Sequence, residues 1–501
     1  MTADAPAPAP VGAGQGRGRF ARATAWAFVM DAGGQVATLA VSVVLAAVLG
    51  PAAYGLVAMA LVYVMFIQLI QQQGMQAAVI QRADLDERHK STAFWLVLVT
   101  SLVLTGLSVL LAGWWSAVNR TPELEPILVA LSALLPIRAL STVQEAVVRR
   151  SMRFRALAVR TLVSVLLGGA AGLWAAFAGL GAWALVVQQL VTAALGCILL
   201  WSVSHWRPRL TFSGTAAREL FGFSTGSFVS SIGVFVNNKA DALLIGIFFG
   251  PLVVGLYRFA ARLVETLLAV AVRPVQSVAL PGLSQHQHDQ VAFDRRSLQL
   301  RAASGWLALP ALGLLMGSAP IVVELLGEEW SSAVWPLRLL CLVGMIRVLV
   351  TLDGPMLQAR GRVHVQAAAT WVAALASAGS FTVAALLLRD SGVVAQATGV
   401  AAARLAVYGV VVLAIHVWLV RRVSRTRWRT VLACYAPAAA TAVLCFVAAT
   451  TVQVVGDRVG WSLLVDVLLV AGLGVLALTV VLHQNRTVLQ TLRNRPGERT
   501  G

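Results

Sequence analysis

The sequence predicts an all-α polytopic membrane protein, and three observations support this fold class. Of the 501 residues, 58% are hydrophobic and only 12% are charged, whereas soluble domains carry about 25% charged residues. Many apolar runs approach or exceed the ~20 residues that a helix needs to cross a bilayer. The runs are continuous rather than alternating, which excludes a transmembrane β-barrel.

About fourteen transmembrane helices are predicted. Gly-Pro turns at Gly50-Pro51 and Gly250-Pro251 and a turn over 179–181 separate adjacent spans, and charged loops separate most of the others. The predicted spans are 26–49, 54–78, 92–118, 126–148, 156–178, 182–203, 220–248, 252–280, 298–326, 333–358, 364–388, 393–419, 431–454 and 461–482.

The distribution of Lys and Arg among the loops predicts the orientation of the chain. One side of the membrane receives 28 of these residues, and the other receives only Arg120, Arg389 and Arg458. Because cytoplasmic loops are enriched in Lys and Arg, both termini are predicted to be cytoplasmic. The chain is therefore expected in the cytoplasmic (inner) membrane. The net charge of +18 also fits nucleic acid, but the basic residues lie in short clusters between apolar runs, so no nucleic-acid partner is predicted.

An internal repeat divides the predicted spans into two lobes. The segment from Gly50 to Leu56 matches the segment from Gly250 to Leu256 at an offset of 200 residues. Two six-helix lobes related by such a repeat commonly enclose a midplane site. The predicted parts are a disordered cytoplasmic N-terminus 1–25, an N-lobe 26–203, a cytoplasmic linker 204–219, a C-lobe 220–420, helices 13 and 14 over 421–483, and a cytoplasmic tail 484–501.

Several blocks of the sequence carry a family resemblance. They include LGPAAYGLVAMALV, RRSMRFRALAVR, HWRPRLTFS and LLGEEWSSAVWPLRLL, and the most specific are the block from Ile80 to Trp95 and the block from Asp241 to Leu263. Over spans 1 to 12 the chain resembles the Wzx-type polysaccharide flippases, relatives of multidrug and toxin extrusion transporters and lipid II flippases. The resemblance implies a V-shaped bundle of fourteen helices. It also implies that the protein flips a polyprenyl-diphosphate-linked oligosaccharide to the outer leaflet.

The candidate substrate site lies on the helix pair around the second Gly-Pro turn. Lys239 and Asp241 precede the turn, and Arg258, Arg262 and Glu265 follow it at helical spacing. Charges at membrane depth normally face a bundle interior or a wet cavity, and the planar Arg fork suits a diphosphate. Substrate contact is therefore predicted for Arg258, Arg262 and Lys239. The alternative is that Arg262 pairs with Glu265 and Lys239 with Asp241.

Four further intramembrane charges are candidates. Arg138 and its repeat mate Arg347 are predicted to bind substrate from opposite sides of a cleft, unless Arg138 and Glu145 belong to a structural ion network. Asp31 and Asp241 open the two lobes and are candidate ion-coupling acids, unless each simply pairs with an Arg.

No catalytic residue, metal site or cofactor is predicted. The sequence contains no GxxxxGK[ST] phosphate loop, which argues against ATP-driven transport by this chain. A membrane glycosyltransferase would need a larger outer catalytic loop. The predicted function is ion-coupled, alternating-access flipping, and the alternative is a cation-coupled multidrug antiporter. The predicted partners are the lipid-linked oligosaccharide, membrane lipids, and a polysaccharide polymerase and glycosyltransferases.

Overall fold

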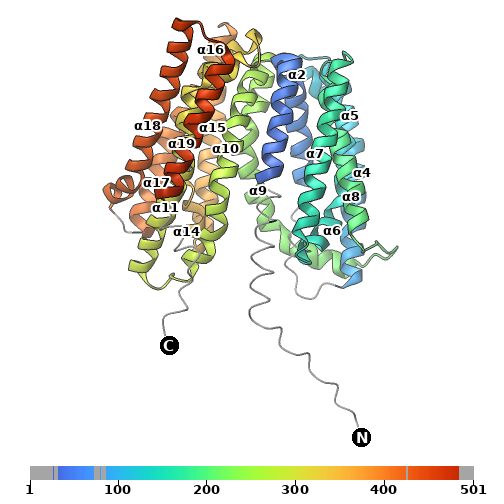
Figure 1. Cartoon of the computed structure of the whole chain (residues 1–501). Helices are drawn as coiled ribbons and strands as arrows, with labels where there is room; N and C mark the ends of the chain where they lie inside the picture. The colour runs from blue at the N-terminus through green and yellow to red at the C-terminus, as the bar shows by residue number, and fades with distance from the viewer. Residues whose placement is uncertain (1–25, 27–31, 73–78, 80–85, 425–426, 485–501) are drawn as a thin grey trace.

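A computed structural model of the chain (Figure 1) describes residues 26, 32–72, 79, 86–424 and 427–484. These residues are almost entirely helical, and they contain no strand. The all-α polytopic fold class is therefore confirmed. The first six helices are α2 (Gly34–Gln72), α4 (Glu87–Val118), α5 (Leu124–Ser132), α6 (Leu134–Arg150), α7 (Phe154–Phe177) and α8 (Trp183–Val203).

The second part of the chain begins with two long helices that meet at Gly250. It consists of α9 (Gly214–Phe249), α10 (Pro251–Ser284), α11 (Gln290–Gly317), α12 (Ala319–Glu324), η2 (Glu328–Ala333), α13 (Val334–Val350), α14 (Asp353–Ala359), α15 (Val363–Leu387), α16 (Val393–Val407), η3 (Tyr408–Val412), α17 (Leu413–Leu419), η4 (Val420–Ser424), α18 (Trp428–Val459) and α19 (Leu463–Gln484).

The described residues contain twelve helices that are long and apolar enough to cross a membrane, or thirteen if the bent helix α9 is counted. The predicted number of fourteen is not confirmed. One difference arises at Gly50, where the sequence predicts a boundary between two spans and the structure has α2 running from Gly34 to Gln72. A straight helix of that length would measure nearly 60 Å, about twice the ~30 Å hydrocarbon core. The non-helical backbone of Gly50 (φ 75°, ψ 170°) divides α2 into two segments.

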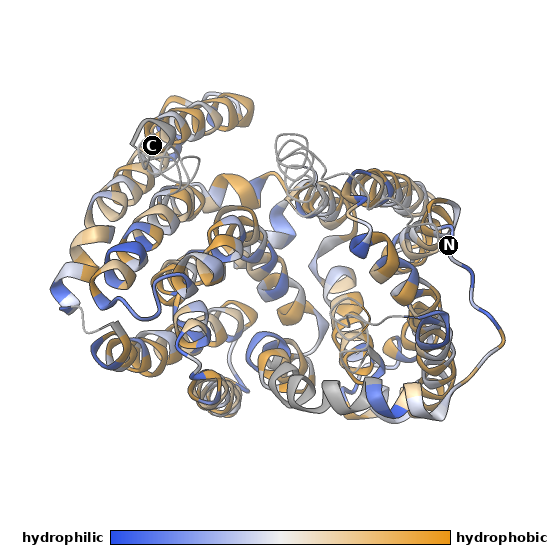
Figure 2. Ribbon diagram, turned by 90° about the horizontal axis from the view of Figure 1, so that it is seen from below, coloured by the Kyte–Doolittle hydropathy of each residue, from blue (hydrophilic) through white to orange (hydrophobic). Residues whose placement is uncertain are grey.

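The helices form two groups that meet along α2 and α10. Figure 1 shows α4 to α8 on one side of this contact and α11 to α19 on the other, and two groups are also seen from below (Figure 2). Helix α18 packs along α11, and α19 contacts both of these helices. The lobe boundaries predicted from the repeat remain predictions, but α2 and α10 are the elements that join the two groups.

The two Gly-Pro segments contact each other reciprocally. A Cβ on Gly55 would overlap the carbonyl oxygen of Pro251, and a Cβ on Gly255 would overlap that of Pro51. Such reciprocity is typical of a contact with local two-fold symmetry. Gly250 also repeats the backbone conformation of Gly50, with φ 78° and ψ −174°. Positive φ is readily available only to glycine, so both turns depend on their glycines.

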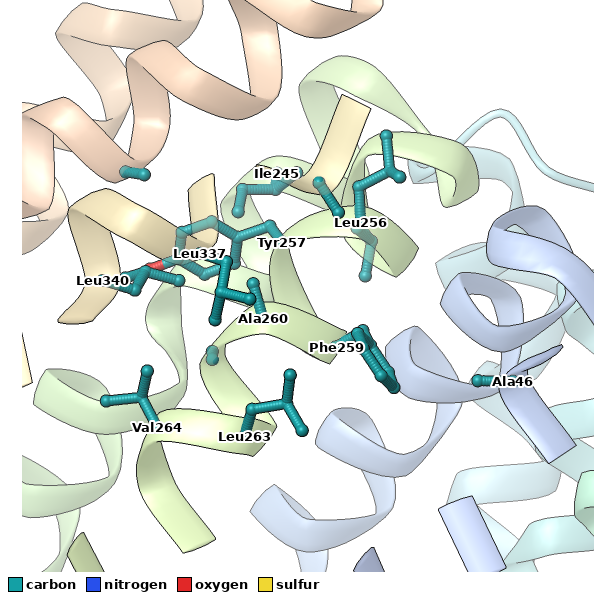
Figure 3. Packing of buried hydrophobic residues seen from close by; sticks show 14 of the residues in the cluster. Ala46, Ile245, Leu256, Tyr257, Phe259, Ala260, Leu263, Val264, Leu337 and Leu340 are labelled. Atoms are coloured by element: carbon teal, nitrogen blue, oxygen red, sulfur yellow. The ribbon is translucent and has the colours of Figure 1, made fainter. Parts of the chain in front are cut away.

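An aromatic cluster packs against the α2–α10 contact at the end where the two Gly-Pro segments meet. The ring of Trp330 in η2 lies 4.8 Å from that of Phe259 and 6.0 Å from that of Tyr54. The Trp330 indole, which is fully buried, donates a hydrogen bond to the Ala46 carbonyl oxygen at 3.2 Å. Figure 3 shows Phe259 pointing toward Ala46, while Tyr257 points to the other side of α10, toward Leu337 and Leu340. The Phe259 side of α10 therefore holds the two groups together, and the Tyr257 side faces the interior of the second group.

Candidate functional site

The larger polar cavity lies within the second group of helices. It has a volume of about 600 Å³ and is lined by α9, α10, α13, α14, α15, η3 and α17. Its charged lining residues are Lys239, Glu265, Arg273, Arg347 and Asp353. Amides and hydroxyls complete the lining, among them those of Asn237, Asn238, Gln276, Thr351, Gln366, Thr370 and Tyr408. The cavity therefore presents three cations and two carboxylates together with many hydrogen-bonding groups.

Two features of the local sequence bring these groups to the cavity. Helix α9 bends by 46° between its segments Ile232–Lys239 and Asp241–Phe249, at the polar run that contains Asn237, Asn238 and Lys239. On α10, Glu265, Ala269, Arg273 and Gln276 recur at helical spacing and share one face, which lines the cavity. The helix pair around Gly250 therefore supplies one wall of the cavity.

A network of buried ion pairs stands behind this wall. Asp241 accepts a hydrogen bond from the Arg404 guanidinium and lies 3.8 Å from Arg258 Nη1. Arg258 Nη1 is also 3.7 Å from Glu265, whose second oxygen is 3.3 Å from Lys239 Nζ. The network thus contains three cations and two carboxylates. Burying charges is tolerated only when they are paired, so this network fixes α9, α10 and α16 relative to one another.

The predicted residues Arg258 and Arg262 do not line the cavity. Arg258 is buried within the ion network, between Asp241 and Glu265. Arg262 is half-buried, and its Nε has no hydrogen-bond partner among the described residues. The alternative pairings expected from the sequence also differ from those observed, since Lys239 pairs with Glu265 and Asp241 with Arg404. Direct substrate contact by Arg258 and Arg262 stays a prediction.

The repeat mates Arg138 and Arg347 line two different cavities. Arg347 lines the large cavity, whereas Arg138 lines one of about 270 Å³ between α6, α7 and α8. Arg138 donates a hydrogen bond to Gln68 at 3.1 Å. In the same cavity Glu145 bridges Arg149 at 2.9 Å and Arg160 at 3.1 Å. The two Arg side chains therefore occupy separate polar pockets, one in each half of the molecule.

The remaining predicted site residues are the two ion-coupling candidates. Asp241 is engaged by Arg404 and Arg258, and it is 1% exposed. A role for Asp241 in ion coupling stays a prediction. Asp31 lies outside the residues that the structure describes.

Three residues without a role predicted from the sequence are prominent in the structure. Arg404 anchors the ion network, and Asp353 and His416 form a separate buried pair beside the cavity. Their signal in the sequence was a charged or titratable residue within a predicted span, which is costly unless it is paired or functional. Without the fold, that signal does not tell which partner each residue meets.

Residues 44–335, more than half of the chain, match a family described as Polysaccharide biosynthesis protein. The chain belongs to this family.

Among the relatives of this family member are a succinoglycan biosynthesis transport protein of Rhizobium meliloti and a teichuronic acid biosynthesis protein of Bacillus subtilis. The first is 29% identical over 58% of this chain and 59% of that protein. The second is 27% identical over 59% of this chain and 62% of that protein. The chain thus spans less than two thirds of the length of these relatives. A lipopolysaccharide biosynthesis protein of Escherichia coli is 24% identical over 64% of this chain and 66% of that protein.

Solved structures share the fold of this family member. A lipid II flippase, MurJ, in an inward closed conformation aligns with a TM-score of 0.68 at 11% identity, over 93% of this chain and 99% of that one. An inward-facing multidrug transporter of the MATE family aligns with a TM-score of 0.58 at 15% identity, over 78% and 95% of the two chains. At these identities the likeness shows the fold alone. This protein is a multi-pass membrane protein with a transporter fold.

Proposed function

We propose that this protein flips polyprenyl-diphosphate-linked oligosaccharides across the cytoplasmic membrane for the synthesis of cell-surface polysaccharide. The observation that carries the proposal is the 600 Å³ cavity with its cationic and amide-rich lining. Membership of the polysaccharide biosynthesis family supports the cargo class, and so do the roles of its relatives in succinoglycan and lipopolysaccharide biosynthesis. The fold shared with a lipid II flippase supports the movement of a lipid-linked sugar.

The charges of the cavity suit a diphosphate. Lys239 is paired with Glu265, and Asp353 is held by His416. Arg273 and Arg347 take part in none of the salt bridges found among the described residues, and both line the cavity. Guanidinium groups bind phosphate oxygens in a bidentate manner. We therefore assign the headgroup to Arg273 and Arg347, and the oligosaccharide to the surrounding amides and hydroxyls.

The lipid tail and the headgroup need different surroundings. Dragging a long polyprenyl chain through water would expose apolar surface at a large cost, so the tail stays in the bilayer while the headgroup crosses through the polar interior. Under the predicted orientation, with both termini in the cytoplasm, the Gly50 and Gly250 turns lie on the outer side. The reciprocal glycine contact and the Trp330 cluster then close the outer side. We therefore infer that this conformation faces inward in an alternating-access cycle, which an ion gradient would drive.

A genetic experiment tests this function. In cells that lack this protein, the wild-type chain should restore surface polysaccharide, and the double variant Arg273→Ala, Arg347→Ala should not. Unflipped lipid-linked oligosaccharide should then accumulate in the cytoplasmic leaflet. The matched control is Arg389→Ala, which removes a predicted outer-loop Arg that does not line the cavity. Normal polysaccharide output from the double variant would refute the assigned site, and drug efflux without polysaccharide export would favour an antiporter.

A further inference from the structure

A buried cluster of Arg301, Asp353 and His416 lies beside the cavity and has no part in the function proposed so far. His416 of α17 places Nδ1 2.7 and 2.8 Å from the two carboxylate oxygens of Asp353 at the start of α14. Arg301 of α11 places Nη2 3.5 Å from the same carboxylate and Nη1 3.4 Å from His416 Nε2. The side chains of His416 and Arg301 are 0% and 1% exposed.

The hydrogen-bond pattern assigns the protons in this cluster. A carboxylate accepts, so His416 Nδ1 carries the hydrogen that it donates to Asp353. The Arg301 guanidinium only donates, so His416 Nε2 faces it with a lone pair. This pattern corresponds to an imidazole with a hydrogen on Nδ1 alone, with which the cluster combines one cation and one carboxylate. A second proton can add at Nε2 only if Arg301 Nη1 moves away from that atom.

The cluster is connected to the cavity through Asp353. The Asp353 side chain is 15% exposed and lines the cavity, whereas His416 lies behind it. Water in the cavity therefore reaches the carboxylate, and the carboxylate contacts the imidazole directly. The Asp353 carboxylate therefore links cavity water to His416 Nδ1, and Nε2 becomes accessible once Arg301 moves away.

The other groups that face the cluster come from four helices. Helix α13 supplies the Leu349 carbonyl oxygen, which accepts from Arg301 at 3.0 Å, and helix α14 supplies the Met356 sulfur at 3.2 Å. Helix α18 packs the Trp428 ring 5.6 Å from the imidazole. Its other groups near Arg301 are the Cys434 thiol and the Tyr435 hydroxyl. On the cavity side the charged lining groups are Glu265 and Arg273 of α10, Arg347 of α13 and Lys239 of α9.

We propose that His416 and Asp353 form a proton-binding site that is linked to headgroup binding in the cavity, an inference that rests on the proposed function. As Arg301 Nη1 withdraws and its contact with His416 Nε2 is lost, a hydronium ion from cavity water transfers a proton to the Nε2 lone pair and is left as water, while the Nδ1–H hydrogen bond to Asp353 is kept. The cluster then gains one positive charge at the wall of the cavity that Arg273 and Arg347 also line. An anionic headgroup binds more tightly to that state, and by thermodynamic reciprocity the headgroup promotes uptake of the proton.

The His416–Asp353 pair differs in one respect from the other ion pairs described above. The Asp241–Arg404 and Glu265–Arg258 pairs consist of groups with a fixed charge near neutral pH, whereas histidine changes charge between about pH 5 and 8 when unperturbed. The structure joins that residue to a carboxylate that water reaches from the cavity. Only the His416 cluster, among the described buried networks, therefore contains both a proton acceptor of this kind and a path to the cavity.

The first test measures protonation directly in the absence of cargo. The full chain, labelled with ¹⁵N-histidine and reconstituted in nanodiscs, is titrated from pH 8.5 to pH 5 by NMR. A chain in which the other six of its seven histidines are replaced by Gln carries the His416 signal alone. We expect a neutral Nδ1–H imidazole at high pH that becomes doubly protonated as the pH falls. A His416 signal that stays neutral over the whole range would overturn the proposal.

The second test measures the linkage, with undecaprenyl diphosphate in the same nanodiscs as the probe. For the wild type we expect affinity to rise about fivefold or more between pH 8 and pH 6 beyond the change in His416→Gln. Gln can donate to Asp353 and accept from Arg301, but it cannot take up the proton. His364→Gln, which changes an exposed histidine on α15, should behave like the wild type. The probe's own ionisation is common to all three proteins and cancels.

The results separate this inference from the proposed function. An identical pH dependence in the wild type and His416→Gln would refute the linkage. Protonation of His416 with the expected linkage, together with an absence of oligosaccharide flipping, would refute the proposed function and leave the proton site standing.

Discussion

The two halves of this protein each enclose a polar cavity, but they balance its charges differently. In the first half Glu145 bridges Arg149 and Arg160, and Arg138 is bonded to the Gln68 amide. In the second half the acidic residues are engaged by Lys239, Arg258 and His416, and Arg273 and Arg347 face a cavity more than twice as large. The pairing of charges thus differs between the two cavities, and under the proposed function it favours an anionic headgroup in the second half.

The largest expected effect tests this difference between the halves. Removing both Arg273 and Arg347 eliminates two charge-assisted contacts at about 1.5–3 kcal/mol each, or a loss of a hundredfold or more in headgroup affinity. Arg138→Ala should cost much less, because its observed partner is a neutral amide within its own half. Binding of undecaprenyl diphosphate to the purified variants measures both effects. Equal losses of headgroup affinity in the double variant and in Arg138→Ala would contradict the proposed difference between the two cavities.

The next effect concerns the ion network behind the cavity. Asp241→Asn leaves Arg404 and Arg258 buried without their shared carboxylate, and breaking a buried pair in this way costs about 3–5 kcal/mol. The detergent-solubilised variant should therefore melt at a much lower temperature than the wild type. Asp390→Asn, in the loop after α15, provides a matched control and should melt normally. A wild-type melting temperature for Asp241→Asn would show that the network is not a structural element.

The reciprocal glycine contact should respond equally from both sides. Gly55→Ala and Gly255→Ala each place a methyl group against a backbone carbonyl of the opposite helix, and overpacking costs about 1–3 kcal/mol. We expect similar falls in melting temperature and weaker closure, measured as the yield of a disulfide engineered between α2 and α10. Gly106→Ala, where nothing lies within 4 Å, should have no such effect. A large effect from only one of the two glycines would contradict the symmetry.

The smallest expected effect lies at the start of α4. The backbone N–H of His89 donates to the Asp86 carboxylate at 2.8 Å, which lowers the pKa of Asp86. A lowered folded-state pKa means that the stabilisation is present above the unfolded pKa and is lost as pH falls through the folded value. Asp86→Ala should lower the melting temperature slightly at pH 7 and not at strongly acidic pH. The opposite trend would contradict this role for the carboxylate.

The fold class was predictable because composition and run length alone decide it. The boundaries of the membrane spans were less predictable. Gly50 and Gly250 were both predicted as turns, yet the number of spans depends on whether a helix bends or ends at such a glycine, and backbone dihedral angles decide that. The candidate site was predictable only to the helix pair. Helical spacing places Glu265 and Arg273 on one face of α10. The sequence does not show that Asp241 would pair with Arg404, which follows it by some 160 positions.

Flipping by the purified, reconstituted protein is the most direct test of the proposed flippase function. Purified protein in proteoliposomes receives a fluorescent polyprenyl-diphosphate-linked oligosaccharide from the producing cells, and the fraction that reaches the opposite leaflet is measured by protection from a membrane-impermeant quencher. We expect rapid flipping by the wild type and near-normal flipping by Arg389→Ala. For the double variant Arg273→Ala, Arg347→Ala we expect flipping little above that of protein-free liposomes. Equal flipping by the wild type and the double variant, or none by the wild type, would contradict the proposed function.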